Sequence, residues 1–319
     1  EKRRLGNSEI RVSPIGLGCW QFSKGVGLAG GYWPALPDEQ IRDIVSASLE
    51  GGITFFDTAE AYGRGASERA LAGALSALGV SPGQVVVATK WMPFFRCARS
   101  ISRTISARTD ALRPFPIDLH QIHNPLSLSS IAKQMREMSE LVSRGIVRTV
   151  GVSNFSAAQM REAHRALSEY GISLVSNQVN YSLLNRRIER NGVLETAAEL
   201  GITIIAYSPL AQGLLTGKFH RDPSLVKKLR GPRRLFRRFR NPEATAPLIE
   251  LLEELAGTYE ATPAQIALNW LISCDTASVV AIPGASGARQ AESNAAALGF
   301  ALTPDDRETL SHRADLIGM

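Results

Sequence analysis

Four ionisable side chains stand at or just after the ends of three successive strand-like runs. Asp57 follows the apolar run 52–56, and Tyr62 comes five residues later in a loop. Lys90 ends the run 84–90, and His123 ends the run 117–123. A single charged residue at a strand end is usually solvated or structural. The whole set is hard to attribute to chance, because the ends of parallel neighbouring strands would bring all four into one site.

These residue types suit the protonation of a carbonyl oxygen. A tyrosine acts as a general acid near neutral pH if its pKa falls well below about 10, and a nearby ammonium lowers that pKa. We expect Lys90 to supply this charge, Asp57 to hold Lys90, and His123 to donate a hydrogen bond to the developing alkoxide. Because no side chain delivers hydride, the reaction would require a nicotinamide cofactor.

Strand-like and helix-like segments alternate along the chain. Apolar runs rich in β-branched residues predict eight strands, near 13–18, 53–56, 85–89, 117–122, 147–152, 174–179, 202–207 and 278–282. Amphipathic stretches predict helices at 38–49, 67–78, 100–112, 131–142, 157–167, 193–200 and 262–272. This order favours an α/β fold, a (β/α)₈ TIM barrel forming one domain over 1–319. Residues 3–12 predict an N-terminal β-hairpin that caps the bottom of the barrel.

Composition indicates a soluble globular protein with a large core, since 44% of residues are hydrophobic and 21% are charged. No apolar run reaches eighteen residues, so we expect no membrane span. Cys19, Cys97 and Cys274 are odd in number and far apart, which argues against a disulfide framework. No Cys/His set has zinc-ligand spacing, so no metal is expected. We expect a cytoplasmic protein, or an organellar one if a targeting segment precedes Glu1.

The positive charge is concentrated in one segment. Residues 227–240 contain eight basic residues and no acidic one, and the net charge of +6 becomes −2 without them. This local basicity argues against a general nucleic-acid surface. Three interpretations stay open: a solvated loop, a docking site for an acidic partner, or a lid in which Arg233 or Arg234 meets the cofactor.

The chain resembles the aldo-keto reductase superfamily over essentially its whole length. The resemblance rests on Asp57 to Gly63, Thr89-Lys90, Gln121 to His123, Gly151 to Phe155, Asn177 to Tyr181, Tyr207 to Leu210, Gly213 to Lys218 and Ile282 to Ala285. In detail it is most similar to the branch with potassium-channel β subunits and with plant and bacterial reductases. The resemblance implies that Asp57, Tyr62, Lys90 and His123 form a catalytic tetrad with Tyr62 as proton donor.

The resemblance also implies a binding site for NADPH (NADP⁺). Ser153, Asn154 and Gln178 would bind the nicotinamide carboxamide, and Tyr207 would stack on the ring. The pyrophosphate would lie along the segment with Ser208, Pro209, Leu210 and Gly213, near Lys218, and the adenosine end along Gly284, Ser286, Gln290 and Asn294. From the residues alone, Asn154 could simply lie near a helix N-cap and Tyr207 in the core. The helix after Gly284 to Gly287 would favour a phosphate at its N-terminus.

Cofactor choice rests on one departure from the family pattern. Many members have an arginine that contacts the 2′-phosphate where this chain has Gln290. Ser286 and Arg289 could serve instead, and NADPH is the expected cofactor. The run Gly25 to Gly30 satisfies G-x-G-x-x-G, but two prolines follow it, so it predicts a loop near the site and not a dinucleotide-binding turn.

Aromatic residues after strand ends are candidates for a substrate pocket. Trp20, Trp33 and Trp91, with Met92, could form its wall or simply pack in the core. The favoured function is reduction of a small-molecule aldehyde or ketone. One alternative is an NADPH-sensing regulatory subunit of a larger complex, and a stable tetramer would support it. Another is a non-redox barrel enzyme, which the predicted nicotinamide-site residues disfavour. An oligomer is compatible with the sequence.

Overall fold

Eight parallel strands form one sheet, in chain order, in the computed structural model, which describes residues 1–27, 32–229 and 242–317. The strands are β3 (Leu17–Gly18), β4 (Phe55–Asp57), β5 (Val86–Trp91), β6 (Ile117–Ile122), β7 (Val147–Ser153), β8 (Leu174–Asn180), β9 (Thr203–Tyr207) and β10 (Val279–Ala281). Parallel bridges join Ile15 to Ala281 and Gly18 to Gly284. These bridges bring the last strand beside the first, which confirms the predicted barrel.

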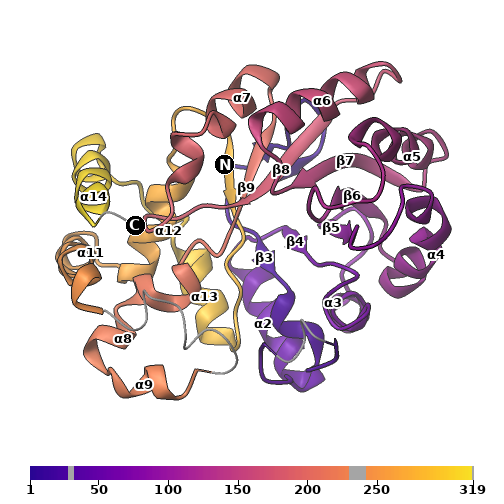
Figure 1. Ribbon diagram of the computed structural model, residues 1–319. Coiled ribbons are helices and arrows are strands. Elements are labelled where there is room, and N and C mark those ends of the chain that lie inside the picture. The colour runs from indigo at the N-terminus through magenta and orange to yellow at the C-terminus, as the bar shows by residue number, and fades with distance from the viewer. Residues whose placement is uncertain (28–31, 230–241, 318–319) are drawn as a thin grey trace.

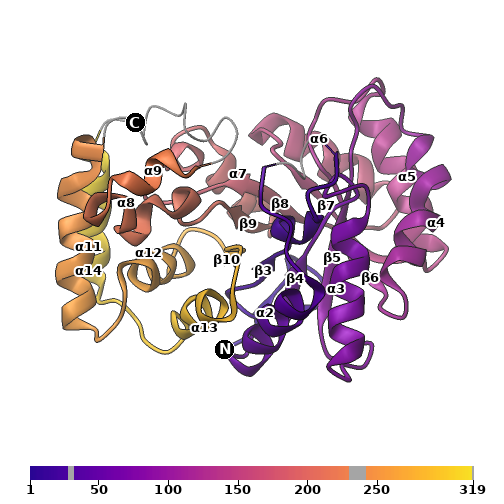
Figure 2. The ribbon, with the colours of Figure 1, turned by 90° about the horizontal axis from the view of Figure 1, so that it is seen from below.

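Helices surround the sheet (Figure 1). Those predicted between the strands are α2 (Asp38–Glu50), α3 (Ala66–Ala77), α4 (Ser100–Leu112), α5 (Ile131–Ser143), α6 (Ala157–Ser168), α7 (Val193–Leu200) and α12 (Pro263–Ile272), and α13 (Ala288–Ala296) follows β10. Within the described ranges, four α-helices were not predicted: the short α8 (Lys218–Arg221) and α9 (Ser224–Lys227), and the longer α11 (Ala246–Thr258) and α14 (Pro304–Leu316). The last two lie side by side at one edge of the barrel (Figure 2).

Side-chain caps fix where several helices begin. Ser156 and Gln159 form a capping box at the start of α6, and Thr262 and Gln265 form another at the start of α12. Each box satisfies backbone N–H groups that the first helical turn leaves without partners. The helix starts are therefore encoded locally.

The N-terminal hairpin closes one end of the barrel, as predicted. Its strands β1 (Arg3–Arg4) and β2 (Arg11–Val12) pair antiparallel. Leu5, Ile10 and Val12 are buried in one cluster with inward residues of the strands. Gly6 N–H donates to Thr203 Oγ1 at the start of β9, so the hairpin covers the amino ends of the strands. The candidate site residues lie at the opposite end of the barrel, at the carboxyl ends of the strands.

Strand alternation selects which residues face the barrel interior. Phe55, Ala88 and Leu119 belong to the interior cluster with the hairpin. Two residues further along each strand stand Asp57, Lys90 and Gln121, which therefore share the inward face. The intervening residues point outward to the helices. A layer of polar side chains thus lies directly above the apolar interior.

Two predicted features fall outside the described residues. Most of the basic stretch, including Arg233 and Arg234, lies within 230–241, and the end of the Gly-rich loop lies within 28–31. Among the described residues, no helix is long and apolar enough to cross a membrane.

Candidate active site

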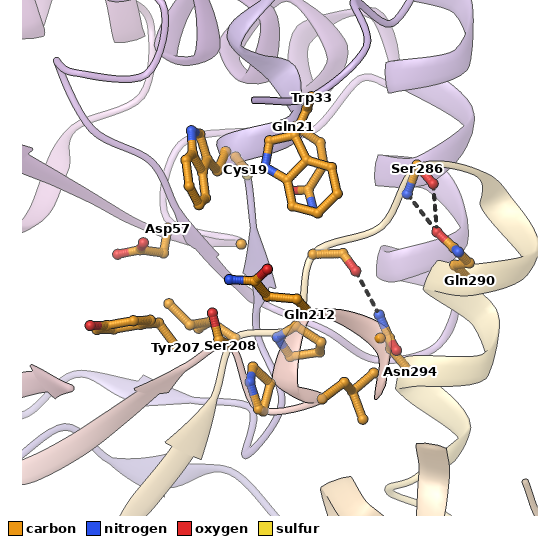
Figure 3. A pocket seen from close by; sticks show the side chains of 18 of the residues that line it. Cys19, Gln21, Trp33, Asp57, Tyr207, Ser208, Gln212, Ser286, Gln290 and Asn294 are labelled. Carbon is orange, nitrogen blue, oxygen red and sulfur yellow. Dashed lines mark hydrogen bonds between the residues drawn. The ribbon is translucent and has the colours of Figure 1, made fainter. Parts of the chain in front are cut away.

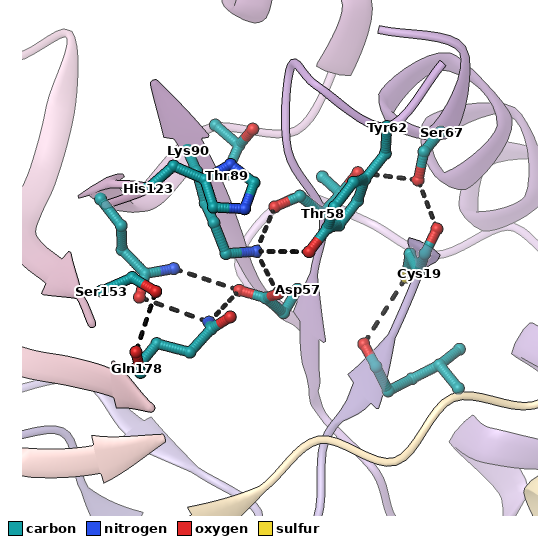
Figure 4. A network of polar contacts seen from close by, with 12 residues as sticks. Cys19, Asp57, Thr58, Tyr62, Ser67, Thr89, Lys90, His123, Ser153 and Gln178 are labelled. Carbon is teal, nitrogen blue, oxygen red and sulfur yellow. Dashed lines mark hydrogen bonds and ion pairs between the residues drawn. The ribbon is translucent and has the colours of Figure 1, made fainter. Parts of the chain in front are cut away.

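Lys90 is the centre of a buried polar network at the carboxyl ends of β4 and β5 (Figure 4). Its ammonium is ion-paired with Asp57 Oδ1, donates to Thr58 O at 2.8 Å, and lies 3.5 Å from Tyr62 Oη. Asp57 Oδ2 accepts hydrogen bonds from Gln121 at 3.1 Å and Gln178 at 2.9 Å. The carboxylate is thus fully engaged, and it holds Lys90 under the tyrosine.

Burial and the strongest neighbouring charge have opposite effects on the pKa values of Lys90 and Tyr62. Burial lowers the pKa of Lys90, but Asp57 and Tyr62 raise it by more, so its pKa lies above the ordinary value and the ammonium stays charged. For Tyr62 the balance is reversed. Burial raises the pKa of the phenol, and the opposing effect of Lys90 does not cancel it. The expected net lowering of the Tyr62 pKa is therefore wrong, although Lys90 does act in the expected direction.

His123 stands opposite the tyrosine. Its ring centroid lies 5.7 Å from that of Tyr62, and the rings are nearly perpendicular. Burial, with Lys90 nearby, lowers the pKa of His123 to about 3, so the imidazole is neutral at physiological pH. A neutral ring still has one N–H to donate. A substrate oxygen within reach of both Tyr62 Oη and this N–H can therefore accept hydrogen bonds from both.

A cavity of about 930 Å³ opens over this network and runs toward α13. Figure 3 shows Asp57 and Tyr207 near one end and Ser286 and Gln290 near the other. The cavity is lined by every predicted site residue apart from Lys90 and Trp91. Lys90 is completely buried beneath the floor, where it contacts Asp57 and Tyr62. The structure thus brings the predicted residues into one continuous site.

The end of the cavity near the tetrad is rich in amides and hydroxyls. Ser153 Oγ donates to Gln178 O at 2.8 Å, and Asn154 Nδ2 donates to Ser153 Oγ at 3.0 Å. Tyr207 Oη donates to Asn154 Oδ1 at 3.0 Å, so this ring is fixed at the cavity wall. Gln178 also donates a hydrogen bond to Asp57, a contact that the sequence did not reveal.

The loop after β9 has an unusual backbone. Ser208, Ala211 and Gln212 have φ values of 51°, 47° and 60°, and Gly213 has a φ of 93°. Left-handed backbone at non-glycine residues is uncommon and clusters at functional sites. A side chain at Gly213 would also meet Lys218, whose Nζ lies 3.3 Å from the position of an added Cβ. Close approach of backbone and cation suits an anionic group.

The far end of the cavity is polar and open. Ser286 donates to Gln290 Oε1 from both its backbone N–H and its hydroxyl, at 2.7 and 2.8 Å. Asn294 Nδ2 donates to Gly284 O at 3.4 Å. Arg289 lines the same end and is exposed. These groups can bind a polar ligand end and offer a cation for an extra phosphate.

The cavity fits an elongated dinucleotide in its donor set. It has an amide-rich end, a central loop of left-handed backbone beside Lys218, and a polar end with Arg289. In addition, Gln21 Oε1 is buried without a hydrogen-bond partner among the described residues, and Gln21 lines the cavity next to Gly284. A buried acceptor of this kind is costly unless a ligand or water satisfies it.

Two of the three predicted tryptophans belong to the cavity wall. Trp20 stacks on Tyr62 with ring centroids 5.9 Å apart, and Trp33 meets Trp20 edge-on at 6.0 Å. Trp91 does not line the cavity, so the prediction that it belongs to the pocket wall is wrong. Because Lys90 points inward, the next side chain points outward, and Trp91 Nε1 donates to Ser100 Oγ at 3.1 Å under α4.

Sequence reasoning missed Tyr32 in the cavity wall and Gln121, which is buried beneath the cavity. Tyr32 stacks on Trp20 at 4.7 Å and donates from its hydroxyl to Gln212 Oε1 at 3.0 Å. This contact links the loops after β3 and β9. Gln121 could have been found, because it lies two residues beyond an interior leucine on the same strand. Among the described residues, no group of three His, Cys, Asp or Glu could hold a metal ion.

Fold and site together define a (β/α)₈ barrel with a buried Tyr–Lys–Asp centre beside an elongated cavity. The profile of the aldo/keto reductase family matches residues 14–313, so the chain belongs to this family.

Curated relatives extend over nearly the whole chain. An uncharacterized oxidoreductase of Mycobacterium tuberculosis is 40% identical over 306 residues, which cover 95% of this chain and 90% of the relative. A chloroplastic pyridoxal reductase of Arabidopsis thaliana is 35% identical over 326 residues, covering 98% of this chain and 86% of the relative.

Solved structures agree with the fold. The glycerol dehydrogenase of Gluconobacter oxydans is similar with a TM-score of 0.84 and 28% identity, over 98% of this chain and 94% of the other. A thermostable aldo-keto reductase in complex with the inhibitor epalrestat is similar with a TM-score of 0.77 and 26% identity, over 98% of this chain and 99% of the other.

Proposed function

We propose that this protein is an NADPH-dependent reductase that converts aldehyde or ketone carbonyls to alcohols, with Tyr62 as the proton donor. The observation that carries the proposal is the position of Lys90 Nζ, which is ion-paired with Asp57 and lies 3.5 Å from Tyr62 Oη. A buried ammonium at a phenol favours loss of the phenolic proton when a neighbouring oxygen needs it.

The residues divide the work by position. NADPH, when bound, supplies hydride for the carbonyl carbon. Tyr62 and His123 would both donate to the carbonyl oxygen, and Tyr62 would transfer its proton as negative charge develops there. General acid help of this kind contributes roughly 10²–10⁴-fold. Because burial keeps the pKa of Tyr62 high, the phenol holds its proton until the substrate oxygen becomes basic.

The cofactor would lie along the cavity with its nicotinamide at the tetrad. Ser153, Asn154 and Gln178 supply donors and acceptors that match a carboxamide, and Tyr207 offers a fixed ring beside them. The pyrophosphate would take the loop 208–213 with Lys218. NADPH is proposed over NADH because Arg289 and Ser286 stand at the opposite end of the cavity, where a 2′-phosphate would need a cation and a donor.

The substrate class follows from the wall above Tyr62. Trp20 and Trp33 present aromatic surface on which a flat ring can stack. The Arabidopsis relative carries the name pyridoxal reductase, and pyridoxal is a flat aromatic aldehyde. Aromatic aldehydes, with pyridoxal first, are therefore the substrates that we propose to test.

The test is the loss of NADPH absorbance in the presence of pyridoxal and a panel of aromatic and aliphatic aldehydes and ketones. We expect turnover with aromatic members of the panel and formation of the alcohol in equal amount to NADPH consumed. Tight NADPH binding without turnover on any aldehyde or ketone would contradict a reductase role.

A further inference from the structure

Glu60 lies two residues before Tyr62 but faces away from the cavity. Its side chain is 10% exposed, and its carboxylate is ion-paired with Arg96 and Arg108. Glu60 Oε1 also accepts the backbone N–H of Met92 at 2.6 Å. In addition, the backbone N–H of Glu60 donates to Lys90 O at 3.2 Å. Glu60 therefore joins the Tyr62 loop to the end of β5 through both its main chain and its side chain.

A second buried carboxylate extends this connection. Arg108 from α4 donates to Glu60 Oε2 at 2.8 Å and pairs through Nε with Glu68 Oε2 at 2.7 Å. Glu68 Oε1 accepts from the hydroxyl of Thr89 at 2.6 Å. Thr89 precedes Lys90 on β5, and Met92 directly follows the end of that strand. Two carboxylates on the Tyr62 side thus hold the segment that carries Lys90.

The contact between Tyr62 and Lys90, which lies between the segments that these carboxylates join, is long. Tyr62 Oη and Lys90 Nζ are 3.5 Å apart, at the limit of a hydrogen bond, so its strength depends steeply on small displacements. The loop that carries Tyr62 turns sharply, with φ values of 70° at Gly63, 53° at Arg64 and 83° at Gly65. Such a turn needs external contacts to hold its end in place.

We propose that Glu60, held by Arg96 and Arg108, is a positioning residue that sets the Tyr62–Lys90 distance. It touches neither cavity nor substrate, and it acts by fixing the Tyr62 loop against the end of β5. The effect on turnover rests on the proposed reductase function, but the effect on the Tyr62–Lys90 contact does not. Misplacement of reacting groups by about 1 Å can cost ~10²-fold in rate.

The test variant is Glu60→Gln, which removes the charge but keeps an oxygen for the N–H of Met92. Its matched control is Asp118→Asn. Asp118 accepts the backbone N–H of Val87 at 2.8 Å and pairs with Arg148 at 2.7 Å, at the amino end of the same strand. Both variants therefore remove one carboxylate charge that anchors β5, at opposite ends. Only Glu60→Gln should affect the site.

The first readout needs neither cofactor nor substrate. With ¹³Cζ-labelled tyrosine, the Tyr62 resonance is the one absent from Tyr62→Phe. In Glu60→Gln we expect it to move toward its position in Lys90→Met, which lacks the ammonium. In Asp118→Asn it should stay at the wild-type position. No shift in Glu60→Gln, or an equal shift in Asp118→Asn, would overturn the proposal.

The second readout is kinetic, once the wild-type protein has shown turnover. We expect Glu60→Gln to lower kcat by about tenfold or more with KM and NADPH affinity nearly unchanged. Asp118→Asn should keep kcat within about twofold. If Glu60→Gln does not fold, Arg96→Gln removes one partner of Glu60 from a less buried position and should give the same shift and a smaller loss. Wild-type kcat in Arg96→Gln or a folded Glu60→Gln would contradict the positioning role.

Discussion

Lys90 Nζ lies 3.5 Å from Tyr62 Oη while the same ammonium is ion-paired with Asp57. Asp57 and Tyr62 line one cavity, and Lys90 lies completely buried beneath its floor. Breaking such a pair leaves a buried charge without compensation, which is strongly destabilising. The arrangement is therefore costly to build, and it places one permanent positive charge at one phenol.

His123 should not titrate in the physiological range. Burial and Lys90 lower the pKa of His123 to about 3, so the ring is neutral from pH 5 to pH 8. We expect kcat/KM for an aromatic aldehyde to show no inflection near pH 6.5 across this range. A pH–rate profile of the wild type and of His123→Gln checks this. An acidic limb near pH 6.5 that disappears in the variant would contradict it.

Substitution of Trp20, in the cavity wall, and of Trp91, outside the cavity, should affect KM differently. Trp20→Leu removes a ring from the cavity wall, and we expect KM for aromatic aldehydes to rise about 3–10-fold, since an aromatic pair contributes ~0.5–1.5 kcal/mol. KM for a short aliphatic aldehyde should change little.

Trp91→Phe is the matched control, because Trp91 packs under α4 away from the cavity. It should lower the melting temperature and leave both KM values near wild type. If KM for aromatic aldehydes rises selectively in Trp91→Phe and does not rise in Trp20→Leu, our assignment of Trp20 and not Trp91 to the cavity wall is wrong.

Cofactor selectivity should depend on Arg289 and not on Lys218. Arg289→Ala should raise the Kd of NADPH about tenfold, the equivalent of one charge-assisted hydrogen bond of ~1.5 kcal/mol, with little effect on NADH. Lys218→Met should weaken both cofactors equally, because both contain the pyrophosphate. Fluorescence titration measures the four constants. Equal losses for NADPH and NADH in Arg289→Ala would rule out 2′-phosphate binding there.

Glu68 should make stability depend on pH. Burial, opposed by Arg108 and Thr89, raises the pKa of Glu68 to about 7 from 4.5. The folded state therefore binds a proton more tightly than the unfolded chain, and this contribution is present below pH 4.5 and lost as the pH rises through 7.

We expect the wild type to lose stability relative to Glu68→Gln between pH 5 and pH 8, by an amount on the order of 1–3 kcal/mol. Urea unfolding at several pH values measures the difference between the two proteins. The other charged or ionisable side chains near Glu68 are present in both proteins, including Glu60, Arg108 and the buried His120. A difference that does not change with pH would show that Glu68 stays ionised when folded.

The positions of the strands, and so of their last residues, could be predicted from the sequence. Strand-end position alone was enough to bring Asp57, Lys90 and His123 together. The error at Trp91 was avoidable, because strand alternation places it opposite Lys90. Helix α14 was missed because its residues are mostly polar, with only Leu310 and Ala314 buried, so the apolar period is too weak to see.

Other features depend on three-dimensional packing and could not be predicted. The net effect on the Tyr62 pKa depends on how deeply the phenol is buried, which no local pattern reveals. The partners of Glu60 come from the loop and helix that follow β5, more than thirty residues away. Their sequence spacing carries no signal, because the parallel pairing of β4 with β5 brings them together.

The most direct test of the account is Tyr62→Phe, which removes one hydroxyl and leaves the ring stacked against Trp20. NADPH affinity would be measured by fluorescence titration and turnover by NADPH consumption with the best aldehyde of the panel. We predict unchanged NADPH affinity and a kcat lowered by about 10²-fold or more, the contribution of a general acid. Turnover within a few-fold of wild type would contradict the claim that Tyr62 donates the proton.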